Sequence, residues 1–141
     1  MKPKVVLFIF ALFLIGACSQ TARLRIGVEE FNSTDWVLEE IDGSAVIDRV
    51  QSTLRFQGND RIVGWGGCNR YFAAVRSGFK FFEVGPIGST RRICPPVVMD
   101  REERFFAALQ KARSIRMKGA NLVIDTEATE KPLKFGRLKK P

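Results

Sequence analysis

The sequence contains no histidine, and its 141 residues include only three cysteines and one tyrosine. The missing histidine excludes a Ser-His-Asp or Cys-His catalytic site, a histidine zinc site and a histidine pH switch within these residues. Three cysteines are too few for a four-cysteine zinc site or a dense disulfide scaffold. We therefore expect no catalytic, cofactor-binding or metal-binding residues, and we expect that the protein is not an enzyme.

Acidic residues are also in the minority, because 15 Asp and Glu stand against 23 Lys and Arg, a formal net charge of +8. The acidic pairs Glu29-Glu30, Glu39-Glu40 and Glu102-Glu103 are sequence neighbours. Neighbouring side chains diverge on a strand or helix, so these pairs do not form a two-carboxylate acid/base site. The glycine-rich segment 64–67 lacks the lysine of a phosphate-binding loop, and it indicates a tight bend or bulge.

Long hydrophobic runs are limited to Val5–Ile15, which has eleven apolar residues. As a helix this run would span about 16 Å, which is too short for a bilayer core. Lys2 and Lys4 precede it, and small residues follow it, as in a secretory signal peptide. We therefore predict a signal peptide over residues 1–17.

The residues around the expected cleavage point, LIGAC ending at Cys18, resemble a bacterial lipobox, in which the cysteine becomes acylated. We predict a lipoprotein-type leader, lipidation of Cys18 and a tether over residues 18–33. The alternative is an ordinary signal peptide with an incidental cysteine. Several acyl chains on one residue would hold the protein stably on a membrane.

Localisation and partners follow from this leader. Ser19 follows the cysteine in place of Asp, which resembles the pattern of outer-membrane lipoproteins facing the periplasm in organisms with two membranes. The basic residues would then lie near anionic lipid headgroups, which we expect as a partner together with the membrane itself or an envelope protein. The alternative is an ordinary solvated basic surface. Nucleic acid is not an expected partner outside the cytoplasm, and we expect a monomer.

From Trp36 onward, short alternating segments are separated by turn residues. Strands are expected at residues 36–41, 53–56, 61–65, 70–76, 79–84, 114–118, 122–125 and 131–138. A turn is expected at Asp42–Gly43, which follows the first strand, and hairpin turns are expected at Gly58–Asp60, Ser77–Gly78 and Gly119–Asn121. Phe79 and Phe81 alternate and are expected to fill the core, with an aromatic-lined cavity as the alternative.

One helix interrupts this pattern. Pro95 and Pro96 argue against regular structure before it, and Asp100 with Glu103 fits a capping box, so a surface helix is predicted over residues 101–112. The fold class expected is therefore mainly β (α+β). We predict an antiparallel curved sheet or small β-barrel of seven to eight short strands with one surface helix.

Four sequence blocks occur together, at residues 36–43, 64–71, 84–95 and 102–109. They include the segments GWGGCNRY, STRRICP and EERFFAAL. This arrangement resembles the META domain, also called the HslJ-like family, of bacterial envelope lipoproteins. The resemblance covers about residues 36–138, and we place the domain at residues 34–141. It implies a compact, mainly antiparallel β fold with one helix, no established catalytic residues, and an association with the cell envelope and stress tolerance.

Cys68 and Cys94 remain once lipidation uses Cys18. In an exported protein, a disulfide is the simplest state of two cysteines. A bond between them would close the loop from Cys68 to Cys94 and stabilise the fold by roughly 3 kcal/mol. The alternatives are two buried free thiols and, less favoured, a metal held by two thiolates.

The sequence therefore predicts a non-enzymatic cell-envelope lipoprotein that supports envelope integrity or stress tolerance by binding another envelope component. The alternative is a carrier or chaperone of lipid or hydrophobic ligands that uses the barrel interior. A wide pocket lined by phenylalanines would favour the carrier. A filled core with an exposed apolar or basic patch would favour the binding protein.

Overall fold

A computed structural model describes residues 31–46 and 50–138. The predicted signal peptide, Cys18 and most of the predicted tether lie outside the described residues. The elements in chain order are β1 (Asp35–Ile41), β2 (Ser44–Ala45), β3 (Thr53–Gln57), β4 (Arg61–Trp65), β5 (Arg70–Gly78), β6 (Phe81–Val84), β7 (Gly88–Ser89), α1 (Pro96–Gln110), β8 (Ala112–Lys118), β9 (Asn121–Thr126) and β10 (Leu133–Arg137).

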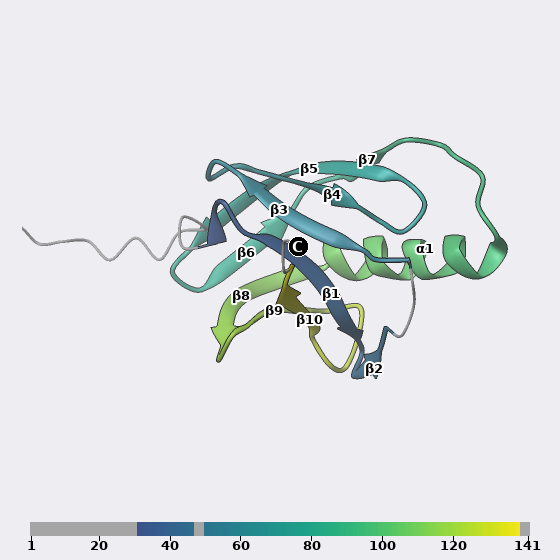
Figure 1. Cartoon of the computed structure of the whole chain (residues 1–141). Helices are drawn as coiled ribbons and strands as arrows, with labels where there is room; N and C mark the ends of the chain where they lie inside the picture. Colours follow the sequence, from purple (N-terminus) through teal and green to yellow (C-terminus); the bar gives the residue numbers. More distant parts are fainter. Residues whose placement is uncertain (1–30, 47–49, 139–141) are drawn as a thin grey trace, which may run out of the picture.

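The strands form one antiparallel sheet in the order β6-β5-β4-β3-β1-β10-β9-β8, with β2 added to β1 and β7 added to β5. The two ends of this path, β6 and β8, lie against each other, so the sheet curls into a nearly closed barrel (Figure 1). This confirms the predicted mainly β fold with one helix. Eight strands make up the path, and the remaining two are two-residue additions at its sides.

The turn residues account for most of the hairpins. Asp42 and Gly43 have φ angles of 51° and 73°, the left-handed conformation that a two-residue hairpin turn requires. Gly58 and Gly119 likewise have positive φ, in the β3–β4 and β8–β9 turns. Glycine adopts this conformation without steric cost, so these hairpins lie where the sequence predicts them.

The β5–β6 hairpin differs from its prediction. The turn falls at Phe79 and the lysine after it, not at Ser77–Gly78, because β5 continues through Gly78. In this register Phe82 is fully buried. Phe79 and Phe81, which we expected in the core, are instead 71% and 46% exposed. Only Phe82 of these three therefore contributes to the core, and the other two occupy the tip and outer side of the hairpin.

Helix α1 also begins earlier than predicted. Pro96 is its first residue, where the missing N–H costs nothing and the fixed φ suits a helix. The predicted capping box is therefore wrong, because Asp100 lies inside the helix, where it pairs with Arg104. Phe105 and Leu109, four residues apart and so on one face of the helix, are fully buried.

Large side chains fill the inside of the barrel. Rings from distant segments pack edge to face, with Phe105 of α1 lying 5.7 Å from Tyr71 and 6.2 Å from Phe135 between ring centroids. Trp36 and Phe82 are fully buried in the same cluster. Among the described residues these side chains form one packed core.

The two ends of the barrel differ. Neighbouring strands run in opposite directions, so alternate turns lie at the same end of the barrel. One end, here called the N-terminal end, contains the start of β1, the β3–β4, β5–β6 and β8–β9 turns, and the end of β10. The β4–β5 turn and α1 lie at the other, here called the helix end (Figure 1). Asn32 confirms the first grouping, because its amide contacts Asn59 in the β3–β4 turn.

Candidate functional site

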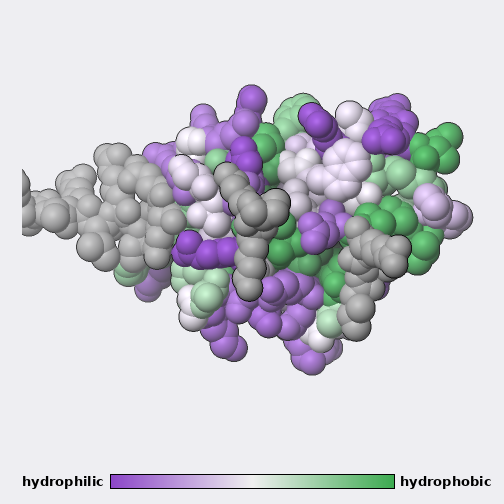
Figure 2. Space-filling view, in the orientation of Figure 1, coloured by the Kyte–Doolittle hydropathy of each residue, from purple (hydrophilic) through white to green (hydrophobic). Residues whose placement is uncertain are grey.

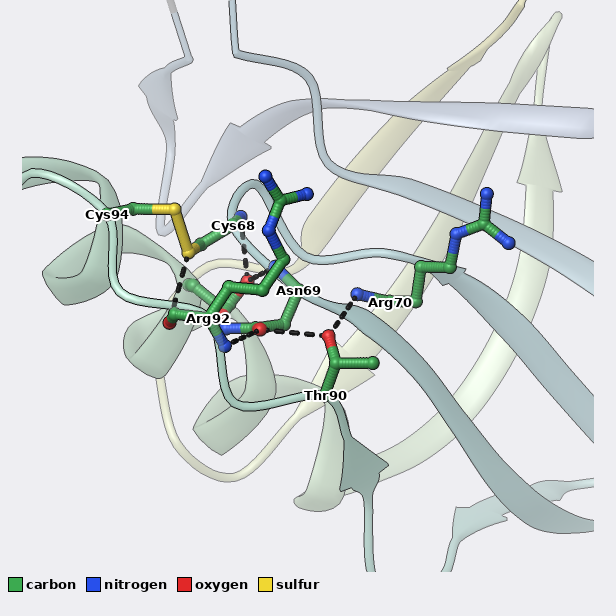
Figure 3. Close-up of a disulfide and its surroundings, with 7 residues drawn as sticks. Cys68, Asn69, Arg70, Thr90, Arg92 and Cys94 are labelled. Atoms are coloured by element: carbon green, nitrogen blue, oxygen red, sulfur yellow. Dashed lines mark hydrogen bonds between the residues drawn. A yellow bond between two sulfur atoms is a disulfide. The ribbon is translucent and has the colours of Figure 1, made fainter.

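The two predicted disulfide cysteines are joined. Cys68 in the β4–β5 turn is bonded to Cys94, just before α1, with their Cα atoms 5.9 Å apart (Figure 3). Cys68 is fully buried. This confirms the disulfide and removes both alternatives, the free thiols and the two-thiolate metal site.

A buried polar cluster lies beside the disulfide. The Glu102 carboxylate accepts hydrogen bonds from the backbone N–H groups of Cys68 (2.8 Å) and Asn69 (2.6 Å) and from the Asn69 side-chain amide (2.7 Å). The side-chain oxygen Oδ1 of Asn69 accepts from the Thr90 hydroxyl (2.9 Å) and the Arg92 backbone N–H (2.7 Å) (Figure 3). Both the oxygen and the nitrogen of the Asn69 side-chain amide are thus hydrogen-bonded.

This cluster explains the glycine-rich segment. A Cβ on Gly66 would lie 2.6 Å from both the Glu102 carboxylate and the Phe106 ring, so only glycine lets the turn approach the helix. Gly67 has a φ of 124°. The segment is the tight bend that the sequence predicts. The Glu102 carboxylate accepts from three donors, so the cluster holds the turn, the loop and the helix together.

An open groove lies on the outer face of β3, β4 and β5, with a volume of about 700 Å³. Cross-strand pairing builds its floor: Val63 is opposite Arg55 on one side and Phe72 on the other, and Trp65 is opposite Arg70. Directly paired residues point to the same face of a sheet. Phe72, which is 55% exposed, and the half-buried Trp65 therefore present aromatic surface between arginines.

The groove carries an excess of positive charge. Its charged lining residues are Arg55, Arg61, Arg70 and Asp35. Asp35 binds Arg55 through both carboxylate oxygens, and this hydrogen bonding raises the pKa of Arg55. Among residues 31–46 and 50–138, neither Arg61 nor Arg70 has a carboxylate partner. Two exposed guanidinium groups are thus available to an anion.

Further contacts fix the shape of the groove. The Phe72 ring lies over Gly88 of β7, where a Cβ would come within 2.6 Å of the ring. The Thr53 hydroxyl accepts a hydrogen bond from the Trp65 backbone N–H at 3.0 Å. The Thr53 backbone carbonyl accepts one from the Tyr71 hydroxyl at 2.9 Å. Burial raises the pKa of Tyr71, so this hydroxyl stays protonated and donates. The aromatic floor is therefore held in place before any ligand arrives.

One more arginine reaches the groove from the loop that carries the disulfide. The Arg92 guanidinium lies 5.8 Å from the centroid of the Trp65 ring, within cation–π range. In Figure 3 the Arg70 side chain extends away from the Asn69 cluster, while its backbone N–H donates a hydrogen bond to the Thr90 hydroxyl at 3.2 Å. The polar cluster thus sets the backbone positions of two arginines, Arg70 and Arg92, that flank Trp65.

Sequence reasoning did not identify this groove. Its arginines are scattered over three strands, and it is the antiparallel register that brings them together. The sequence did contain one signal. In residues 53–57, 61–65 and 70–72, every second residue points away from the core, and these outward positions hold arginines and aromatic residues on one face.

No three His, Cys, Asp or Glu side chains come close enough to hold a metal among the described residues. Nor does any helix there have the length and hydrophobicity that a bilayer crossing requires.

Comparison with known proteins places this fold in a family. Residues 29–140 match the META domain, so the chain belongs to the META domain family. A solution NMR structure of a protein from Burkholderia xenovorans is 21% identical, with a TM-score of 0.60 over 80% of this chain and 87% of that one. A second NMR structure is 20% identical, with a TM-score of 0.61 over 77% and 92% of the two chains. No curated protein matches the chain. The two likenesses establish the shared fold.

Proposed function

We propose that the protein is a non-enzymatic envelope lipoprotein whose groove binds an anionic saccharide of the cell envelope. The observation that carries the proposal is the pair of exposed guanidinium groups, Arg61 and Arg70, on either side of an aromatic floor; within the described part of the chain neither has a carboxylate partner. Arginine binds carboxylate and phosphate groups through paired N–H donors. Support for an envelope role and for stress tolerance comes from the lipobox-like leader and from the family.

The aromatic floor of the groove indicates that the ligand carries sugar rings between its anionic groups. Trp65 and Phe72 offer flat apolar faces of the kind on which a sugar ring can stack, and both flank Val63. Small β-barrels elsewhere use an outer strand face to bind oligosaccharides. An open groove suits a polymer that passes through, whereas an acyl chain would need an enclosed cavity.

Titration with a short oligogalacturonate tests the proposal, and its methyl ester serves as an uncharged matched ligand. We expect the acid form to bind the full chain with a change in tryptophan fluorescence, and the ester to bind much more weakly. Arg61→Ser with Arg70→Ser should lower the affinity at least about tenfold, since each charge-assisted hydrogen bond contributes about 1.5–3 kcal/mol.

The control variant is Lys111→Ser with Lys118→Ser, which removes the same charge from exposed positions outside the groove. It should bind the oligogalacturonate like the wild type. If both double variants lose affinity equally, the attraction is general and the groove is not the site. Equal binding of the acid and the ester would exclude the arginines as the recognising groups.

A further inference from the structure

The tip of the β5–β6 hairpin is an unusual surface for an exposed turn. Phe79 is 71% exposed and Phe81 46% exposed, and the Lys80 amine lies 5.9 Å from the centroid of the Phe79 ring. The Phe81 ring covers Gly78 rather than entering the core. Two phenyl groups beside an ammonium group form an amphipathic tip, and this combination suits the boundary between lipid headgroups and acyl chains.

The position of this tip is the second observation. It lies at the N-terminal end of the barrel, where the described chain begins at Phe31. Phe31 packs on Phe56 at a centroid distance of 5.7 Å, and Phe56 packs on Phe82 of the same hairpin at 6.1 Å. The start of the domain and the aromatic tip are therefore neighbours in space.

The length of chain before the domain sets its distance from an anchor. Phe31 lies 13 residues after Cys18. Fully extended, that segment spans at most about 45 Å. The helix end lies farther away by the length of a barrel strand such as β5, about 30 Å for its nine residues. An anchor on the N-terminal segment is thus attached at the N-terminal end of the barrel and lies within about 45 Å of it.

The charges at this end are compatible with an anionic surface. Lys80 and Lys118 are exposed in the β5–β6 and β8–β9 hairpins, and Asp60 is the acid of the β3–β4 turn. The Arg76–Glu83 pair on the sides of the hairpin neutralises itself. The free charge at the tip itself is therefore the positive charge of Lys80.

From these observations we propose that the β5–β6 tip docks on the lipid bilayer, with Phe79 and Phe81 at the headgroup boundary and Lys80 among the phosphates. This contact orients the barrel with its helix end away from the membrane. It goes beyond the proposed function, and it uses a surface separate from the groove.

A second exposed apolar patch, at the helix end, supplies the control. Ile93 and Val97 there are 94% and 67% exposed, and Figure 2 shows hydrophobic surface (green) on that side of the molecule. If hydrophobicity alone decided docking, this patch would compete with the tip. The two patches lie at opposite ends of the barrel, so a single experiment separates them.

Depth-dependent quenching tests the proposal. The full chain carrying Phe79→Trp or Ile93→Trp is reconstituted in vesicles of phosphatidylcholine and phosphatidylglycerol, with or without bromine on the acyl chains. Both substitutions replace an exposed side chain and should leave the fold intact. We expect the tryptophan at position 79 to shift to shorter emission wavelengths and to be quenched by brominated lipid, relative to the wild-type background of Trp36 and Trp65.

The tryptophan at position 93 should show neither effect. Equal quenching at both positions, stronger quenching at position 93, or no quenching at position 79 would each overturn the proposal. Arg61→Ser with Arg70→Ser, combined with Phe79→Trp, should leave the quenching unchanged. The membrane contact and saccharide binding can therefore fail independently.

Discussion

At the scale of single residues, Glu102 is the clearest case of a charged side chain used for structure. It is buried, and it accepts from two backbone N–H groups and from the Asn69 amide. Its neighbour Glu103 is exposed, as expected for adjacent helical positions. One carboxylate of the pair therefore holds the turn, and the other is solvated.

Glu102→Gln should destabilise the fold by about 2–3 kcal/mol. The glutamine oxygen can still accept from the backbone, but its NH₂ group then faces the NH₂ group of Asn69. Asn69 cannot rotate to relieve this, because its oxygen already accepts from Thr90 and Arg92. Urea unfolding measures the loss, and Glu103→Gln is the matched control, for which we expect no change. Equal stability of the two variants would show that the buried carboxylate is not required.

At the scale of elements, the disulfide ties the β4–β5 turn to the start of α1. Both cysteines lie at joints rather than within a strand, so the bond does not interrupt a ladder. The same joint contains the Asn69 hydrogen bonds to the loop before the helix. Covalent and polar links therefore hold one end of the barrel closed.

Cys68→Ser and Cys94→Ser should each destabilise the domain by roughly 3 kcal/mol on the loop-entropy account. The double variant should be no less stable than either single one, because the same bond is lost in all three. Reducing agent should lower the Tm of the wild type and leave the Tm of the variants nearly unchanged. Mass mapping after alkylation without reduction should find no modified Cys68 or Cys94, and two alkylated thiols would contradict the bond.

At the scale of the whole molecule, the barrel has two dissimilar ends and a charged groove along its side. The N-terminal end holds the beginning of the domain and the aromatic tip, while the helix end holds the disulfide and the polar cluster. The groove lies on the side of the barrel, between its two ends, on the outer face of β3, β4 and β5. A protein anchored through its N-terminal segment would thus keep the groove exposed.

Anchoring itself remains the prediction from LIGAC at residues 14–18. Cys18→Ser should abolish incorporation of a fatty-acid analogue during growth, because the acylated thiol is gone. Metabolic labelling followed by gel fluorescence measures this. Equal labelling of the wild type and the variant would contradict lipidation at this residue, whereas Ser19→Ala should label like the wild type.

Local signals in the sequence determined most of the secondary structure. Alternating residues between Asp-Gly, Gly-Asn-Asp and Gly-Ala-Asn turns predict β1, β3, β4, β8 and β9 because period two and positive-φ turn residues are local properties. The META-like blocks predict the family, and Cys68 and Cys94 predict their bond on the expectation that the domain is exported. Each of these predictions depends on residues close in sequence, or on the expected export of the domain.

Only the tertiary structure decided which face each residue joins and which distant residues meet. Phe79 and Phe81 alternate like core residues, yet the register that buries Phe82 exposes them, because a shift of one residue reverses every side chain on a strand. Arg61 pairs with Ala74 and Arg70 with Trp65, and it is this register that puts both arginines on the groove face. The groove and the aromatic tip, on which both functional proposals rest, are therefore products of register and barrel closure.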